Sequence, residues 1–217
     1  MASGGSDLRR EAGQRTRECL LRTTLHLLAA RGPDGLSLRE VTEAAGTNVA
    51  AVSYHFGSLR ALRDAAVESA LETYLDAQLG ALAPLSADST LRELAAAFAR
   101  PMMHALAVGG PELAIMRTVA RVGIDPPDSW GRLTAKFEQT RTDALRVLTA
   151  RLPEVGHEEL TFRTRCAAGL LNWLVMAPIG GELAARPAEQ IERWLVPVLT
   201  GTLEGHAHPG TGALLRG

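Results

Sequence analysis

Apolar residues recur every three or four positions along most of the chain, and this spacing predicts helices rather than strands. The first helix is expected over residues 9–30, and Gly32 and Pro33, which follow it, should end it. Alanine and leucine are abundant and aromatic residues make up only 4% of the chain, a composition typical of helical proteins. Longer helices are expected over residues 58–82, 90–108, 111–122, 129–151, 159–176 and 187–204. The pattern therefore predicts an all-α protein of about nine helices.

Two short helices joined by a tight turn are predicted over residues 38–55. Residues 37–40 form a capping box, in which the first serine accepts from the Glu40 amide and Glu40 accepts from the serine amide. Gly46 ends the first helix, and Asn48 caps the second. The helices are expected to pack through Val41, Ala44, Ala45 and Val52. This helix-turn-helix leaves the second helix free to enter the major groove of DNA.

The free face of the second short helix carries Val49, Ala50, Ser53 and Tyr54. This helix is poor in arginine, asparagine and glutamine, the residues best suited to bind a base edge through two hydrogen bonds. Base discrimination would then depend on methyl groups, including that of Ala51, and on DNA shape.

Charge is distributed unevenly along the chain, although the net charge is only −1. Residues 1–63 hold nine arginines and six acidic residues, whereas residues 64–217 hold fourteen basic and eighteen acidic residues. A basic end adjacent to the helix-turn-helix favours a nucleic-acid partner. The first arginines either contact the minor groove or form a solvated arm.

The stretch SLREVTEAAGTNVAAVSYHFGSLRAL, residues 37–62, resembles the DNA-binding segment of the TetR/AcrR-type bacterial transcription regulators. The likeness extends over residues 16–64, and the rest of the chain matches that family only in helix count and length. The resemblance implies a three-helix DNA-binding domain with a flexible N-terminal arm over residues 1–60. It also implies a ligand-binding and dimerisation domain over residues 61–217, and a repressor that binds a palindromic double-stranded DNA operator as a homodimer.

Individual roles follow from the same resemblance. It implies phosphate contacts for Ser37 and Asn48. Tyr54 and His55 match a pair of aromatic positions, and core and cap roles are the alternative for these two residues. The family's usual lysine after Gly-Ser is Leu59 here, which makes Arg60 the candidate for that phosphate contact. The implied DNA-binding residues are Ser37, Thr47, Asn48, Val49, Ala50, Ala51, Ser53, Tyr54, His55 and Arg60.

The C-terminal half has two strongly apolar helices, over residues 159–176 and 187–204, which suit either an ordinary core or an interface with a second copy. The middle helices are expected to enclose a cavity for a small, mostly apolar effector, since few charges occur among their apolar residues. Core packing is the alternative for each lining residue. The candidates are Met102, Met103, His104, Met116, Arg117, Trp130, Phe137 and Trp173.

Several classes of function lack support in the sequence. The histidines and cysteines do not have metal-ligand spacing, and no nucleotide or nucleophile motif is present, so we expect no metal, no cofactor and no enzyme activity. No apolar run reaches the roughly 20 residues of a membrane span. Cys19 and Cys166 are expected to be buried thiols of a cytoplasmic protein. The alternatives are a ligand-independent or activating regulator of the same fold and, further away, a helical protein-interaction module without DNA affinity.

Overall fold

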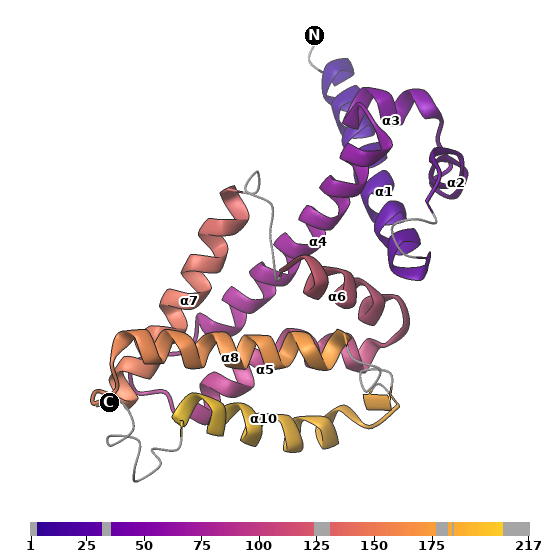
Figure 1. Cartoon of the computed structure of the whole chain (residues 1–217). Coiled ribbons are helices and arrows are strands. Elements are labelled where there is room, and N and C mark those ends of the chain that lie inside the picture. Colours follow the sequence, from indigo (N-terminus) through magenta and orange to yellow (C-terminus); the bar gives the residue numbers. More distant parts are fainter. Residues whose placement is uncertain (1–3, 32–35, 124–130, 177–181, 184, 206–217) are drawn as a thin grey trace, which may run out of the picture. The chain divides into compact units, whose positions relative to one another are not determined.

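The structure is a computed structural model that describes residues 4–31, 36–123, 131–176, 182–183 and 185–205 (Figure 1). These residues confirm the all-α prediction, and none of them lies in a strand. The helices are α1 (Gly4–Arg31), α2 (Leu38–Ala44), α3 (Val49–Phe56), α4 (Leu59–Leu82), α5 (Leu91–Val108), α6 (Gly110–Gly123), α7 (Gly131–Arg151), α8 (His157–Met176) and α10 (Ala188–Glu204).

Helix α1 begins earlier than the sequence pattern predicts. It starts at Gly4 instead of residue 9, so residues 4–8 of the expected flexible arm are helical, and residues 1–3 lie outside the described part. Asp7 stands in the first turn, where a carboxylate interacts favourably with the positive end of the helix dipole.

The chain divides into two compact units. Unit 1 comprises residues 1–74 and 108–133, and unit 2 comprises residues 75–107 and 134–217. These units follow from contacts within the chain. The predicted DNA-binding domain (1–60) and effector domain (61–217) are defined by function and stay predictions.

In unit 1, α1, α2, α3 and the first turns of α4 enclose one small core. Leu20, Val41 and Leu62 have no exposed surface, and Val52 of α3 is 1% exposed. Ala45 packs against this core as predicted, but Ala44 is exposed, and its predicted contact is wrong. Ala44 is the last residue of the seven-residue α2, and it is exposed to solvent beside the core that Val41 and Ala45 contact.

Unit 2 contains α8 and α10, which lie side by side (Figure 1). Arg163 of α8 donates to the carbonyls of Leu203 and Glu204, which the end of α10 leaves without helical partners. The same guanidinium pairs with Glu159 one turn earlier. This contact fixes the last turn of α10 against α8. No helix in the described part of the chain is both long enough and apolar enough to cross a membrane.

Helix α5 contains Pro101, which has no amide hydrogen and cannot donate to the carbonyl of Ala97 four residues earlier. Gln78 of α4 replaces that donor, since its Nε2 lies 3.1 Å from the Ala97 oxygen. Both residues are buried in unit 2, where an unpaired carbonyl would be costly. Gln78 is therefore buried because it supplies the hydrogen bond to Ala97 that Pro101 cannot form.

This pairing predicts a coupled effect on stability. Gln78→Met should lower the free energy of unfolding by about 1–3 kcal/mol, because it removes the donor to a buried carbonyl. In a Pro101→Ala background the new amide can donate to Ala97, and the same change should cost clearly less. Denaturant titration of the four proteins of this double-mutant cycle measures the coupling. Equal costs in both backgrounds would show that Gln78 does not compensate for the proline.

Candidate nucleic-acid interface

The capping box at the start of α2 is present with both of its hydrogen bonds. The Glu40 amide donates to Ser37 Oγ at 3.3 Å, and the Ser37 amide donates to Glu40 Oε2 at 3.0 Å. Arg31 at the end of α1 reaches the same carboxylate at 2.7 Å. Hydrogen bonds from the Ser37 side chain and backbone, followed by the charge of Arg31, lower the pKa of Glu40. The carboxylate therefore stabilises the fold above its ordinary pKa, and this contribution is lost as the pH falls through the lowered value.

The turn between α2 and α3 depends on Gly46, whose φ of +63° lies in the left-handed region. Asn48 then caps α3, because its Oδ1 accepts from the Ala51 amide at 3.0 Å. Gly57, with φ of +78°, ends α3, and the Ser58 hydroxyl accepts from the Ala61 amide at 3.1 Å to begin α4. Side-chain caps therefore fix the start of each of these three helices, and those at Ser37 and Asn48 lie where the sequence predicts them.

Helix α3 has one buried and one exposed face. Val52 is the buried anchor, and half-buried Ala51 packs beside it on the unit 1 core. On the other side Val49 is 49% exposed and Tyr54 is 84% exposed. Ala50 and Ser53 are also exposed. The face predicted from the sequence is thus open to solvent within the chain.

The two aromatic residues after Ser53 differ in their surroundings. The Tyr54 ring meets the His55 ring edge-on, with centroids 4.9 Å apart, and extends into solvent. His55 is half-buried and lies so close to α1 that a side chain added at Gly13 would come within 3.8 Å of it. His55 therefore packs against α1, which corresponds to the core alternative for this residue, whereas Tyr54 is available to a partner.

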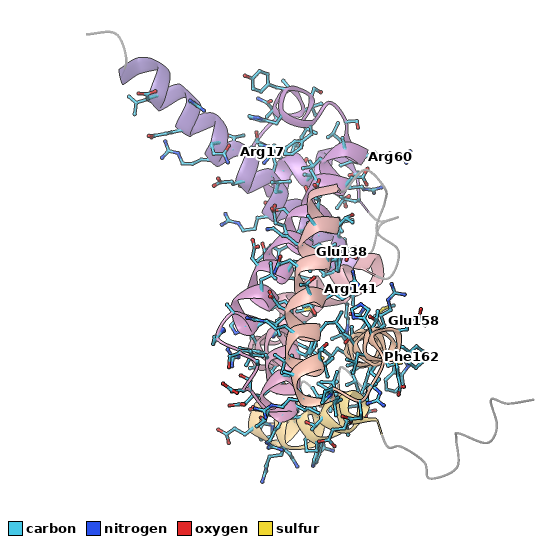
Figure 2. The ribbon with its side chains drawn as sticks, turned by 90° about the vertical axis from the view of Figure 1, so that its left-hand side faces the viewer. Arg17, Arg60, Glu138, Arg141, Glu158 and Phe162 are labelled. Carbon is cyan, nitrogen blue, oxygen red and sulfur yellow. The ribbon has the colours of Figure 1, made fainter. Side chains whose placement is uncertain are left out.

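Two arginines lie near the C-terminal end of α3. Arg60 is exposed on the first turn of α4, and Arg17 of α1 covers the Phe56 ring at 5.3 Å from its centroid (Figure 2). Ser37 and Asn48 are exposed as well, whereas Thr47 is half-buried.

Sequence reasoning missed Arg63, whose Nη2 donates to the carbonyl of Leu36 at 2.9 Å. This bond attaches α4 to the residue that precedes the α2 cap. Its sequence signal was only another arginine within a basic segment. The partner carbonyl, on a residue 27 positions earlier, could not be identified without the fold.

Comparison with known protein families identifies the segment that contains α2 and α3. Residues 20–66 match the family model described as bacterial regulatory proteins, tetR family. The chain carries a TetR-family helix-turn-helix. The matched residues include α2, α3 and the hydrophobic core beneath them.

Solved structures extend the TetR likeness to the whole fold. A protein described as a TetR-family transcriptional regulator from Mesorhizobium loti is 18% identical with a TM-score of 0.60, over 88% of this chain and 96% of the other. The ketosteroid transcriptional regulator KstR2 of Mycobacterium tuberculosis is 18% identical with a TM-score of 0.58, over 85% and 93%. No curated protein matches the chain.

A structure described as superantigen PfiT is equally similar, at 20% identity and a TM-score of 0.59 over 84% of this chain and 95% of the other. Such identities show the fold alone, and one fold can serve several functions. The chain thus has the fold of TetR-family DNA-binding transcriptional regulators. What it does depends on its surfaces.

The predicted effector residues lie in different surroundings. In unit 2, Met102 is buried, Met103 and Phe137 are half-buried, and His104 and Trp173 are exposed. Met116 and Arg117 are half-buried in unit 1, and Trp130 lies outside the described residues. An open groove of about 550 Å³ in unit 2, lined by residues such as Arg92, Arg151 and Thr200, involves none of these candidates.

Helix α8 has a second apolar face that sequence reasoning did not separate from its core face. Leu160, Thr164, Ala167, Leu171 and Val175 are buried, whereas Phe162, Cys166, Gly169, Trp173 and Met176 are exposed. Cys166 was therefore wrongly expected to be buried. Phe162 is 66% exposed and lies at the outer edge of α8 (Figure 2). On α10, Trp194 and Val198 are 49% and 55% exposed.

Proposed function

We propose that this chain is a transcription repressor that binds a palindromic DNA operator as a homodimer and is released by a small, mostly apolar effector. The observation that carries the proposal is the exposed face of α3, which is held outward by the Val52 anchor and fixed by the Asn48 cap. A capped helix with a free face of this kind fits the major groove. Its place of action is then the cytoplasm, where bacterial DNA lies.

Phosphate contacts are proposed for the groups around α3. The Asn48 side chain occupies the Ala51 amide, and the amides of Val49 and Ala50 at the start of this helix would suit a phosphate oxygen. Arg60 offers a charged partner, and Tyr54 offers a hydroxyl that nothing in the described chain covers. Binding that depends on such contacts should weaken as salt rises.

A gel-shift titration with footprinting on the DNA that flanks the protein's own gene tests DNA binding. Tyr54→Ala should weaken operator binding by about tenfold or more, since each half-site loses a contact. Tyr54→Phe removes only the hydroxyl, and its operator affinity should lie between those of the parent and of Tyr54→Ala. Thr149→Ala, an exposed change on α7, is the matched control and should bind as the parent does. If Tyr54→Ala binds normally, the recognition face is misplaced, and absence of any shift would favour the protein-interaction alternative.

The proposed homodimer uses the exposed face of α8 together with exposed residues of α10. The α8 residues follow each other at intervals of four and three positions, so that their side chains form one stripe along the helix. Large exposed apolar patches are unusual on a monomer and mark an interface. A second copy is the natural partner, because a two-fold axis lets the same stripe serve both chains.

Trp173→Glu should convert the dimer to a monomer, because it places a charge in the middle of the apolar stripe. Sedimentation or light scattering measures the mass, and Thr149→Glu on the exposed side of α7 serves as the matched charge control. The monomeric variant should also lose most of its operator affinity, since only one half-site is bound. A parent protein that is monomeric at micromolar concentration, or a variant that stays dimeric, would rule out this interface.

The proposed effector occupies the middle helices, for which the apolar side chains of Met102, Met103 and Phe137 are the support in unit 2. Lining of this kind suits a ligand with a large apolar part. The neighbouring KstR2 is described as a ketosteroid regulator, so steroids belong among the compounds to test.

Thermal-shift screening of hydrophobic metabolites should find a class that stabilises the protein, by about 2.7 kcal/mol at a concentration one hundred times its Kd. The same compound should release the protein from its operator, since a ligand shifts binding only through its different affinities for the two states. If no apolar class has an effect on a protein that binds DNA, the ligand-independent alternative is favoured. If the compound strengthens DNA binding, the protein is not a repressor released by that effector.

A further inference from the structure

The exposed face of α3 presents methyl groups and single hydroxyls, and no side chain on it can form two parallel hydrogen bonds with a base. Val49 and Ala50 are apolar, while Ser53 and Tyr54 each carry one hydroxyl. A base edge is usually distinguished by a forked side chain such as arginine, asparagine or glutamine. This face therefore needs another means of telling one base pair from another.

The neighbouring side chains considered next do not replace the missing bidentate contact with a base. Asn48 uses its Oδ1 to cap the helix through the Ala51 amide at 3.0 Å. Arg39 of α2 pairs with Glu43 at 2.7 Å, and His55 packs beside Gly13 of α1. Arg60 stands on α4, after the Gly57 break, where it suits a phosphate better than a base.

The major groove offers one apolar feature, the 5-methyl group of thymine. A valine side chain that is 49% exposed on the first turn of α3, followed by an exposed alanine, matches that feature in size and polarity. We infer that Val49 and Ala50 select thymine at one or two fixed positions of each operator half-site, through contact with its 5-methyl group. This inference rests on the proposed function, because it requires α3 to lie in the major groove.

Replacing thymine by deoxyuridine tests the contact directly, because it removes the methyl group and leaves base pairing and the hydrogen-bonding groups unchanged. The full-length dimer is titrated with footprinted operators in which each thymine of the half-sites is replaced in turn. At the recognised position, binding should weaken about fourfold for one half-site and about fifteenfold for both, the effect of losing one buried methyl group per site. Deoxyuridine outside the footprint is the DNA control.

Val49→Ala tests the protein side of the same contact. The variant should bind the thymine operator more weakly than the parent and should lose most of the parent's preference for thymine over deoxyuridine at that position. Placing 5-methylcytosine there should restore part of the affinity lost on replacing thymine by cytosine, since it returns the methyl group to the same place. Folding of the variant is checked by its thermal unfolding, which should be unchanged because Val49 is exposed.

The outcomes separate this inference from the proposed function. A protein that binds its operator but tolerates deoxyuridine at every position overturns the methyl contact and leaves the proposed function intact. Unchanged discrimination by Val49→Ala assigns the methyl contact to another residue and overturns the role of Val49. A protein that binds none of the DNA flanking its gene overturns the proposed function, and the inference with it.

Discussion

The exposed face of α3 depends on how one buried valine and one asparagine hold a short helix. An eight-residue helix is too short to be stable alone, so its position must come from contacts outside itself. Val52 anchors its inner side in the unit 1 core, and Asn48 fixes its first turn. Gly46 allows the chain to reverse between α2 and α3 without strain. Because these groups satisfy the inner face and the start of the helix, the remaining side chains are free to meet a partner.

The sequence predicted this region well because its determinants are local. A capping box, a glycine with positive φ and an asparagine cap act within a few residues, and all three are found where the pattern places them. The buried and exposed sides of α3 also follow from helical spacing, although Ala44 shows that spacing does not choose between neighbours in a short helix. The start of α1 was harder to predict, because residues 4–8 contain no periodic apolar stripe.

Contacts between distant residues were not predictable in the same way. The pairing of Gln78 with the carbonyl freed by Pro101 joins two helices, and only the fold shows that these residues meet. Helix α8 illustrates a second difficulty. Its two apolar faces, one buried and one containing Phe162 and Trp173, are mixed in sequence, so hydrophobicity alone cannot separate core from surface. The assignment of Cys166 to the core failed for this reason, and the predicted effector residues are ambiguous for the same reason.

The exposed face of α3 and the exposed apolar stripe of α8 have complementary roles in the proposed function. A face that discriminates bases through methyl groups would gain about 0.8 kcal/mol, or fourfold, from each contact, whereas a bidentate pair of hydrogen bonds provides about 1–3 kcal/mol. A single copy would therefore select its site weakly among many competing sequences. In the proposed homodimer, two copies joined through the α8 stripe would multiply the preferences of their half-sites and add the requirement that the half-sites be correctly spaced. If α3 discriminates bases in the way we infer, the proposed dimer has to be stable, and the exposed apolar residues of α8, such as Phe162 and Trp173, are consistent with that need.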